Sequence, residues 1–342
     1  MYLRRLTYVI RVGINGFGRI GRMVLRQSLS QEGVEVVAVN DLFGVESFAH
    51  LLKYDTAYGK LPEEVAVDGD DLMVAGRRIQ FSSEKDPAHI PWNDAGVEVV
   101  IESTGVFRDR DSAAKHLEAG ASRVIISAPA KDPDCTLVLG VNHEDYDPKE
   151  HRVISNASCT TNCLAPMVRV LDDLVGVERG LMNTVHAYTA DQQLVDGPHK
   201  DLRRARAAAA NVVPTTTGAA VAVGEVLPTM RGRLDGFAVR VPLPSVSLLD
   251  LTVVPGRETD VDEINRGFCG AAEGAMKGIL AVTDEALVSS DFLGDTASAT
   301  VDLGLTQVVG ARLVKVVAWY DNEMGYATRI VELAAMVGED NS

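Results

Sequence analysis

The fold of this chain is decided by residues 9–21, V-I-R-V-G-I-N-G-F-G-R-I-G. Residues 9–15 are mostly apolar and rich in β-branched side chains, which predicts a buried strand. Three glycines in the pattern G-x-G-x-x-G follow at once, at Gly16, Gly18 and Gly21. Residues 22–30 then predict a helix. Glycine clusters alone are common in turns, but this succession of strand, glycines and helix indicates a turn that a dinucleotide can approach closely.

An acidic residue completes the dinucleotide pattern. Residues 34–40 predict a second strand, which ends at Asp41, 20 residues after Gly21. The pyrophosphate is expected at the helix N-terminus, and the Asp41 carboxylate can accept hydrogen bonds from the ribose hydroxyls. Because that carboxylate repels a 2′-phosphate, the pattern favours NAD over NADP. An α/β unit without a nucleotide is the alternative, and the complete pattern argues against it.

The alternation of strands and helices continues through the first half of the chain. We expect strands at residues 97–102, 123–127 and 136–141, with a helix at residues 111–119. Such a series predicts an α/β fold with a Rossmann-type, doubly wound parallel sheet.

A second motif, S-N-A-S-C-T-T-N-C at residues 155–163, follows a short strand at residues 152–154. Ser158 is a good N-cap for a helix that runs to residue 174, which places Cys159 in the first turn. The positive end of the helix dipole favours a thiolate there, so Cys159 is a candidate nucleophile. A buried, inert cysteine is the alternative. The other three cysteines indicate packing rather than chemistry: Cys135, Cys163 and Cys269.

Further candidate groups lie in the second half. His186 follows a predicted strand at residues 181–184 and could act as the base for a thiol, although a lone histidine is more often structural. Arg240 lies within an apolar strand, where a cation needs an anionic partner, either a buried carboxylate or a substrate. Arginines and threonines gather at residues 189–218, which suggests phosphate capture; a solvated face or an oligomer contact is the alternative.

The remaining pattern of the second half predicts an α+β domain. Strands are expected at residues 242–254 and 313–319, and helices at residues 218–227 and 260–275. A final amphipathic helix is expected at residues 324–336.

Composition limits the choice of function. A chain of 342 residues suggests two domains, and a net charge of −15 argues against nucleic acid and anionic membranes as partners. No apolar run approaches the roughly 18 residues of a membrane span. Residues 1–10 lack the features of a signal peptide, and the four cysteines form neither a disulfide framework nor a zinc site. We therefore expect a cytoplasmic protein without a metal; residues 1–8 have no role that the sequence explains.

Through six motifs, the chain resembles the phosphorylating glyceraldehyde-3-phosphate dehydrogenase family over residues 11–337. The motifs are G-I-N-G-F-G-R-I-G-R, S-N-A-S-C-T-T-N-C-L-A-P, H-A-Y-T, D-L-R-R-A-R-A-A-A, P-T-T-T-G-A-A and W-Y-D-N-E-M-G-Y. The resemblance implies a NAD-binding Rossmann domain at residues 1–158, against which a C-terminal helix within residues 323–342 packs. It implies a catalytic domain at residues 159–322 and a homotetramer.

The resemblance also implies roles for individual residues. Cys159 is the expected nucleophile and His186 its base. The residues expected to contact NAD are Gly16, Gly18, Arg19, Ile20, Gly21, Asp41, Lys85, Ser127 and Asn322. One anion site is expected at Ser158, Thr160, Arg206, Thr217 and Gly218, and the other at Thr189 and Arg240.

The implied reaction is the NAD-dependent oxidation of D-glyceraldehyde 3-phosphate, with inorganic phosphate, to 1,3-bisphosphoglycerate in glycolysis and gluconeogenesis. It proceeds through a thiohemiacetal and a thioester on the cysteine. Lys85 stands where the family usually has arginine, and Gly197 leaves room for some use of NADP. Two alternatives are an erythrose-4-phosphate dehydrogenase and a non-enzymatic thiol redox sensor. The intact H-A-Y-T and S-A-P segments argue against the first, and the paired anion sites against the second.

Overall fold

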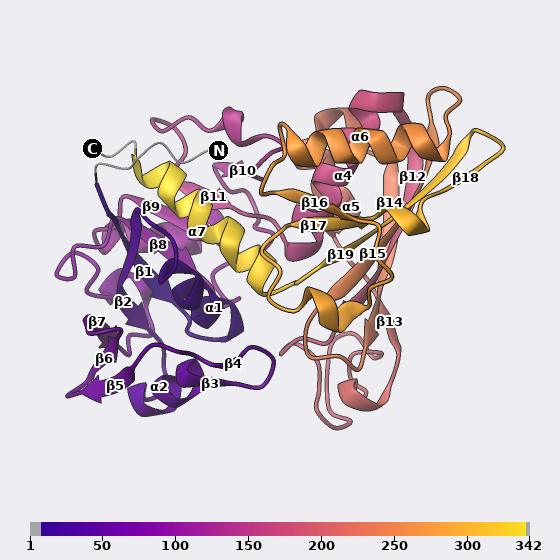
Figure 1. Ribbon diagram of the computed structural model, residues 1–342. Helices are drawn as coiled ribbons and strands as arrows, with labels where there is room; N and C mark the ends of the chain where they lie inside the picture. Colours follow the sequence, from indigo (N-terminus) through magenta and orange to yellow (C-terminus); the bar gives the residue numbers. More distant parts are fainter. Residues whose placement is uncertain (1–7, 340–342) are drawn as a thin grey trace. The chain divides into compact units, whose positions relative to one another are not determined.

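The computed structural model describes residues 8–339, which divide into two compact units (Figure 1). Within that range, the first unit contains residues 8–137, 144–157 and 327–339, and the second contains residues 138–143 and 158–326. The chain enters the second unit after Ala157, one residue before the expected boundary at Ser158. The expected domain also included residues 1–7 and 340–342, which lie outside the described residues.

The first unit is built on one large sheet. In the described part of the chain it has nine strands in the order β10-β11-β9-β8-β1-β2-β7-β6-β5, and pairing from β10 through β7 is parallel. The strands are β1 (Ile10–Asn15), β2 (Val34–Asn40), β5 (Val65–Asp68), β6 (Asp71–Val74), β7 (Arg77–Ser82), β8 (Val99–Glu102), β9 (Arg123–Ile126), β10 (Cys135–Thr136) and β11 (Val153–Ser155). This arrangement confirms the predicted α/β fold with a Rossmann-type sheet.

Helices and a hairpin complete the first unit. They are α1 (Arg19–Ser28), α2 (Val45–Lys53), α3 (Arg110–Glu118), the hairpin strands β3 (Tyr54–Asp55) and β4 (Gly59–Lys60), and residues 327–339 of α7 (Met324–Glu339). Every residue of β8 and β9 is buried, as expected for parallel strands that are covered on both faces.

Two of the motif glycines are required by the backbone itself. Gly16 has φ +91°, and a Cβ there would lie 2.6 Å from the backbone nitrogen of Thr104. A Cβ on Gly21 would lie 2.3 Å from the carbonyl oxygen of Gly16. Both distances are too short for any side chain, so this turn between β1 and α1 needs glycine at each position.

The predicted strand at residues 136–141 is wrong, because β10 ends at Thr136. The backbone N–H of Val138 instead donates to Asn142 Oδ1 at 2.9 Å, and that of Val141 donates to the carbonyl of Val138 at 3.0 Å. Gly140 adopts φ +79° in this turn. The asparagine side chain thus competes with a neighbouring strand for the backbone groups, which the apolar composition of the segment concealed.

The second unit is a mixed sheet with helices packed on it. In the described residues it has eight strands in the order β13-β14-β12-β15-β19-β17-β16, and β18 also pairs with β19. The strands are β12 (Val177–Ala187), β13 (Val213–Thr215), β14 (Leu234–Val241), β15 (Ser247–Pro255), β16 (Leu280–Thr283), β17 (Ala299–Asp302), β18 (Gln307–Val309) and β19 (Leu313–Tyr320). The helices are α4 (Cys159–Val175), α5 (Ala219–Val226) and α6 (Val261–Glu273).

The layering of this unit follows from the pattern of its strands. Residues of β15 alternate between buried and half-buried, and α4 packs on β12, β15 and β17 with α5 and α6 beside it. The predicted α+β domain is therefore confirmed. The expected strand at residues 242–254 begins only at Ser247, because Pro242 and Pro244 lack the N–H groups that a sheet ladder needs.

Short 3₁₀ helices connect the main elements: η1 (Pro87–His89), η2 (His143–Asp145), η3 (Ala208–Ala210), η4 (Pro228–Met230), η5 (Ser289–Phe292) and η6 (Leu303–Leu305). Among residues 8–339, no helix has the length and apolar character needed to cross a membrane.

Candidate active site

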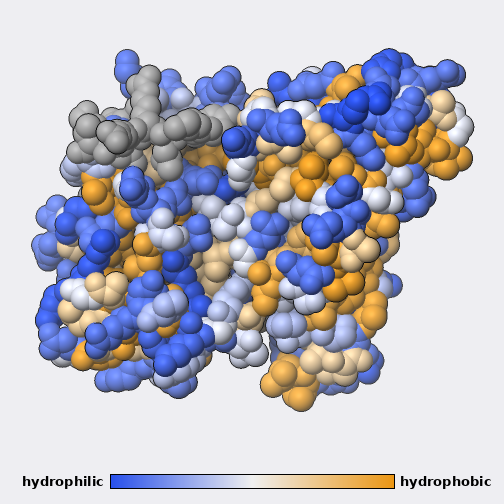
Figure 2. All heavy atoms as spheres, viewed as in Figure 1, coloured by the Kyte–Doolittle hydropathy of each residue, from blue (hydrophilic) through white to orange (hydrophobic). Residues whose placement is uncertain are grey.

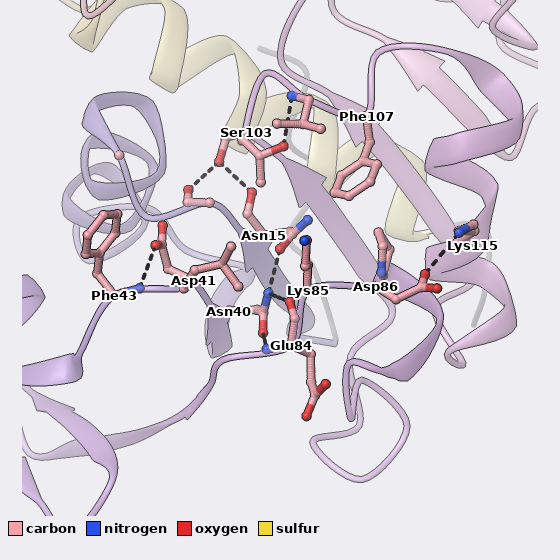
Figure 3. A pocket seen from close by; sticks show the side chains of 16 residues that line it. Asn15, Asn40, Asp41, Phe43, Glu84, Lys85, Asp86, Ser103, Phe107 and Lys115 are labelled. Atoms are coloured by element: carbon pink, nitrogen blue, oxygen red, sulfur yellow. Dashed lines mark hydrogen bonds and ion pairs between the residues drawn. The ribbon is translucent and has the colours of Figure 1, made fainter.

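The first unit contains a pocket at the carboxyl ends of β1, β2 and β8, with a volume of about 720 Å³ (Figure 3). Polar residues that end these strands line it, and apolar side chains complete its wall: Asn15, Asn40, Asp41, Ser103 and Thr104, with Leu42, Phe43, Val106 and Phe107. The carboxyl ends of parallel strands are the usual binding place in such sheets.

Asp41 is fixed at the edge of this pocket. Its Oδ2 accepts a hydrogen bond from the backbone N–H of Phe17 at 2.7 Å, and its Oδ1 accepts from that of Phe43 at 3.2 Å. Each carboxylate oxygen keeps a second lone pair that can accept from a ligand hydroxyl. Gly18 also lines the pocket, and no atom lies within 4 Å of the position that a Cβ would take there. The backbone of Gly18 is therefore open to a ligand.

The other residues that were expected to contact NAD divide into two groups. Lys85 lines the pocket with Gly16, Gly18 and Asp41. Figure 3 shows the Lys85 side chain on the same side of the pocket as Asn15 and Asn40. The pocket lining, within the described residues, does not include Arg19, Ile20, Gly21 or Ser127.

Arg19 has a structural partner. Its guanidinium pairs with Asp55, whose side chain is 2% exposed, and one of the two contacts measures 3.3 Å. Burial raises the pKa of Asp55, but Arg19 and the backbone N–H groups of Tyr58 and Ala57 outweigh it and hold the pKa below its ordinary value. This pair ties α1 to the hairpin that follows α2.

The second unit carries the candidate nucleophile at the start of α4. Ser158 is the N-cap, and its Oγ accepts from the backbone N–H of Thr161 at 3.0 Å, as the sequence predicts. Cys159 is half-buried, and its Sγ lies 3.5 Å from Nε2 of His186 on β12. Cys163, one turn further along the helix, is completely buried. The structure thus brings Cys159 together with His186 and leaves Cys163 in the core.

The tautomer of His186 follows from its neighbours. Nδ1 lies 2.6 Å from the carbonyl oxygen of Ala187 and 2.7 Å from Nη1 of Arg240. The carbonyl oxygen can only accept, which favours a protonated Nδ1, whereas the guanidinium can only donate, which favours a bare Nδ1. Because Arg240 can donate instead to the same carbonyl at 3.0 Å, we assign the Nδ1–H tautomer, in which both nitrogens donate to that oxygen. Nε2 is then an acceptor that faces the thiol.

The charges around this pair act in opposite directions on the cysteine. Burial raises the pKa of the Cys159 thiol, while Arg240 and hydrogen bonds from Thr160 lower it. Burial, aided by Arg240, lowers the pKa of His186 to about 3. The pair therefore rests as a thiol and a neutral imidazole at neutral pH. The helix dipole and Arg240 favour the thiolate, and burial opposes it.

Tyr320 is a site residue that the sequence reasoning missed. Its Oη is hydrogen-bonded to Oγ1 of Thr160 at 3.0 Å and of Thr184 at 2.8 Å. Its ring makes an edge contact with His186, with 6.0 Å between centroids. Burial raises the pKa of Tyr320, so its hydroxyl stays protonated. The signal was available, because Tyr320 directly follows the predicted strand at residues 313–319 and lies in the same W-Y-D-N-E motif as Asn322.

The arginines at residues 203–206 face different surroundings. The Arg206 side chain is 62% exposed and pairs with Asp196 at 2.8 Å. Arg204 is only 19% exposed; its Nε donates to Thr215 Oγ1 at 2.8 Å, and its Nη1 lies 2.5 Å from Asp191 Oδ2. The charge of Arg204 also contributes to lowering the pKa values of His186 and Arg240. Arg204, rather than Arg206, is thus the arginine whose field acts on the pair.

The remaining anion-site candidates lie at the ends of elements in the second unit. Thr217 and Gly218 directly precede α5, and Thr217 Oγ1 accepts from the backbone N–H of Ala219 at 3.3 Å. Thr189 is half-buried in the segment after β12.

Asn322, which was expected to contact NAD, is 5% exposed, and its Oδ1 accepts from Ser247 Oγ at 2.9 Å. Among residues 8–339, no three His, Cys, Asp or Glu side chains are grouped to hold a metal ion.

A Rossmann-type sheet with a dinucleotide pocket, and a second sheet that holds a thiol beside a neutral imidazole, together define a cysteine-dependent dehydrogenase. Comparison with known families identifies which family of dehydrogenases the chain belongs to. Residues 158–322 match the model described as "Glyceraldehyde 3-phosphate dehydrogenase, C-terminal domain", and residues 10–110 match "Glyceraldehyde 3-phosphate dehydrogenase, NAD binding domain". The chain belongs to the glyceraldehyde-3-phosphate dehydrogenase family.

Curated relatives agree over almost the whole chain. The chain is 56% identical to "Glyceraldehyde-3-phosphate dehydrogenase" of Geobacillus stearothermophilus over 328 residues, which cover 96% of this chain and 98% of the relative. It is equally identical, at 56% over 330 residues, to "Glyceraldehyde-3-phosphate dehydrogenase 1" of Bacillus subtilis, with 96% and 98% coverage. The relative from Streptomyces coelicolor is also 56% identical, over 331 residues, again with 96% and 98% coverage.

Proposed function

We propose that this chain oxidises D-glyceraldehyde 3-phosphate with NAD and inorganic phosphate to give 1,3-bisphosphoglycerate, in glycolysis and gluconeogenesis. The observation that carries the proposal is the 3.5 Å contact between Cys159 Sγ and the acceptor Nε2 of His186. Curated relatives at 56% identity bear the name glyceraldehyde-3-phosphate dehydrogenase, which gives the substrate.

Cys159 and His186 perform the covalent steps in this proposal. Nε2 takes the thiol proton, the thiolate adds to the aldehyde carbon, and His186 returns the proton to the aldehyde oxygen, which gives the thiohemiacetal hydroxyl. His186 then removes the proton of the thiohemiacetal hydroxyl as the carbon is oxidised, which leaves a thioester on Cys159. An oxygen of inorganic phosphate attacks the thioester carbon, the acyl phosphate leaves, and the thiolate returns.

NAD, when bound, supplies the acceptor for the hydride that leaves the substrate carbon. The pocket of the first unit fits it, since the open face at Gly18 admits the pyrophosphate and the fixed carboxylate of Asp41 can accept from the ribose hydroxyls. Asp41 favours NAD over NADP, and Gly197 leaves room for some use of NADP. Asn322, fixed by Ser247, is proposed to bind the carboxamide.

Two anion sites are needed, one for the phosphate of the substrate and one for the incoming phosphate. We place the first at Thr189 and Arg240. The second is assembled from groups at two helix starts: Ser158, Thr160, Thr217 and Gly218. Arg204 is a better cation for it than the expected Arg206, because the Arg204 side chain is only 19% exposed and its charge acts on His186, whereas Arg206 is 62% exposed. Tyr320 positions the Thr160 hydroxyl.

We also propose that the chain works as a homotetramer in the cytoplasm. Several large apolar side chains of the second unit are exposed, which is typical of surfaces that another chain covers. They are Leu181, Leu194, Val195, Leu202 and Phe237, from 50% to 82% exposed. Figure 2 shows hydrophobic surface gathered on this unit. Sedimentation of the purified protein tests the state, and a monomer would contradict it.

Steady-state kinetics test the proposed reaction. NADH formation from glyceraldehyde 3-phosphate should require inorganic phosphate, with NAD preferred to NADP. Folded protein that forms no NADH, or whose rate is the same with and without phosphate, would refute the proposal. A higher kcat/KM with erythrose 4-phosphate would reassign the substrate.

A further inference from the structure

A buried carboxylate lies beneath the pocket of the first unit and has no role in the proposed chemistry. Glu102 ends β8 and is 2% exposed. Its Oε1 accepts from the backbone N–H of Thr104 at 2.8 Å and from the Thr104 hydroxyl. Its Oε2 accepts from Nδ2 of Asn15 at 2.6 Å. Among residues 8–339, no lysine or arginine pairs with it, so hydrogen bonds alone stabilise it.

The fourth donor to Glu102 is His116 of α3, whose Nε2 lies 3.0 Å from Oε2. Trp92 decides the protonation of this histidine. The indole Nε1 lies 3.0 Å from His116 Nδ1, and an indole N–H can only donate. Nδ1 must therefore be a bare acceptor, which places the proton on Nε2, directed at Glu102. All three groups are buried to 2% exposure or less.

The network continues into the walls of the pocket. Asn15 Oδ1 accepts from Asn40 Nδ2 at 2.9 Å. The Asn40 amide also donates to the carbonyl of Glu84 at 2.9 Å, and its oxygen accepts from the N–H of Glu84 at 2.8 Å and from Ser82 Oγ at 2.9 Å. Asn15, Asn40, Glu84 and Thr104 all line the pocket, while Glu102 and His116 lie behind that lining. Figure 3 shows the bonds that join Asn15, Asn40 and Glu84.

We propose that Glu102 and His116 are positioning residues for NAD, acting through Asn15 and Thr104 to fix the floor of the pocket. Every member has a defined donor or acceptor role, from the indole of Trp92 to the backbone that precedes Lys85. A fully satisfied buried network of this kind has one arrangement, so it holds the strand ends in place before the ligand binds. The inference rests on the proposed function in taking NAD as the ligand of this pocket.

Glu102→Gln tests the acceptor role with almost no change in size. A glutamine amide presents one oxygen and one NH₂ group, so it must turn its NH₂ either toward Thr104 or toward Asn15 and His116, all of which are donors. We expect the dissociation constant for NAD, measured by calorimetry on the full-length protein freed of nucleotide, to rise about tenfold. The kcat at saturating NAD and the KM for the aldehyde should stay within about twofold, since both are measured with NAD already bound in the pocket.

Two substitutions at His116 separate positioning from general stability. His116→Gln can place an amide nitrogen near the position of Nε2 and keep the donor to Glu102. His116→Asn can place an amide oxygen near the position of Nδ1 and keep the acceptor for Trp92, but it loses the donor to Glu102. We expect NAD binding of the Gln variant to be closer to wild type than that of the Asn variant, even where their melting temperatures match.

Tyr146→Phe is the matched control, because it removes a bond from Arg123 Nε in the same unit at 3.0 Å, away from the pocket lining. It should lower the melting temperature without changing the affinity for NAD. Wild-type affinity in both Glu102→Gln and His116→Asn would overturn the inference, as would equal losses in the two His116 variants. If Glu102→Gln does not fold, the His116 pair decides. Absence of NAD binding by the wild-type protein would refute the proposed function, and the inference with it.

Discussion

The pocket of the first unit and the thiol site of the second unit differ in how completely their buried polar groups are hydrogen-bonded. Around Glu102, each donor meets an acceptor, and the tautomer of His116 is fixed by Trp92. Around Cys159, a single nitrogen of His186 has two competing neighbours, and the buried Nε of Arg240 has no partner among the described residues. The hydrogen bonds of the binding pocket are thus complete before a ligand binds, whereas the reactive site keeps unsatisfied groups that can bond a substrate anion.

The largest expected effect comes from removing the nucleophile. Cys159→Ser should lower kcat/KM by roughly 10³-fold or more, because the serine hydroxyl is a far weaker nucleophile in this setting. Calorimetry should find the affinity for NAD within about twofold of wild type, since Cys159 is not among the residues that line the pocket. A large loss of NAD affinity in this variant would contradict the view that Cys159 takes no part in binding the nucleotide.

Removal of the base is the next prediction. His186→Asn should lower kcat by roughly 10²- to 10⁴-fold, the usual contribution of a general base. The Asn side chain keeps polarity but cannot take the thiol proton. Stopped-flow measurement of the first turnover should show the loss in the chemical step. An unchanged rate would mean that another group accepts the proton.

Arg240 should control the pH at which Cys159 becomes reactive. Its positive charge lowers the pKa of the thiol. Arg240→Leu should therefore move the midpoint of Cys159 alkylation by iodoacetamide to higher pH. The sign follows because loss of a nearby cation makes the thiolate less favourable. Arg206→Leu is the control, since that exposed residue pairs with Asp196 and should leave the midpoint in place. A midpoint that moves down, or does not move, in Arg240→Leu would contradict this view of the site.

Asp41 is expected to have a smaller effect, confined to the nucleotide. Asp41→Ala removes the carboxylate that accepts from two backbone N–H groups and makes the expected ribose contact, so the KM for NAD should rise about tenfold. Because the repulsion of a 2′-phosphate also disappears, the ratio of activity with NADP to activity with NAD should increase. Parallel kinetics with both nucleotides measure it. A ratio that falls would overturn the role of this carboxylate.

The smallest expected effect is on stability. Asp55→Asn weakens the pair with Arg19 and should lower the free energy of unfolding by about 1–2 kcal/mol at pH 7. Because the pKa of Asp55 is lowered in the folded protein, its contribution is present above the unfolded pKa, about 3.9, and is lost as pH falls through the folded value. Urea unfolding should thus show a difference from wild type at pH 7 that shrinks in acid. A difference independent of pH would contradict the assignment.

The sequence predicted most of what is local. The glycine turn could be predicted because the backbone at Gly16 and Gly21 leaves no room for a side chain. The N-cap of α4 could also be predicted, since the Ser158 hydroxyl accepts from the backbone N–H of Thr161, only three residues further along the chain.

Contacts between distant segments were not predictable in the same way. Glu102, His116 and Trp92 lie in three separate segments, with 24 residues from Trp92 to His116, and each alone resembles an ordinary core or surface residue. Arg204 and Arg206 have the same composition around them, and only the fold shows that one faces Thr215 and the other Asp196. The missed turn after Thr136 has the same cause, because the Asn142 side chain replaced a sheet partner that composition had suggested.

The most direct test of the account is to stop the reaction at the thioester. The full-length protein is mixed with NAD and glyceraldehyde 3-phosphate without inorganic phosphate, and NADH and intact mass are measured together. We expect a burst of about one NADH per chain, with one acyl group on Cys159 that added phosphate removes. NADH formation without a covalent adduct, or an adduct of the same mass in Cys159→Ser at the same rate, would contradict the central role of the thiol.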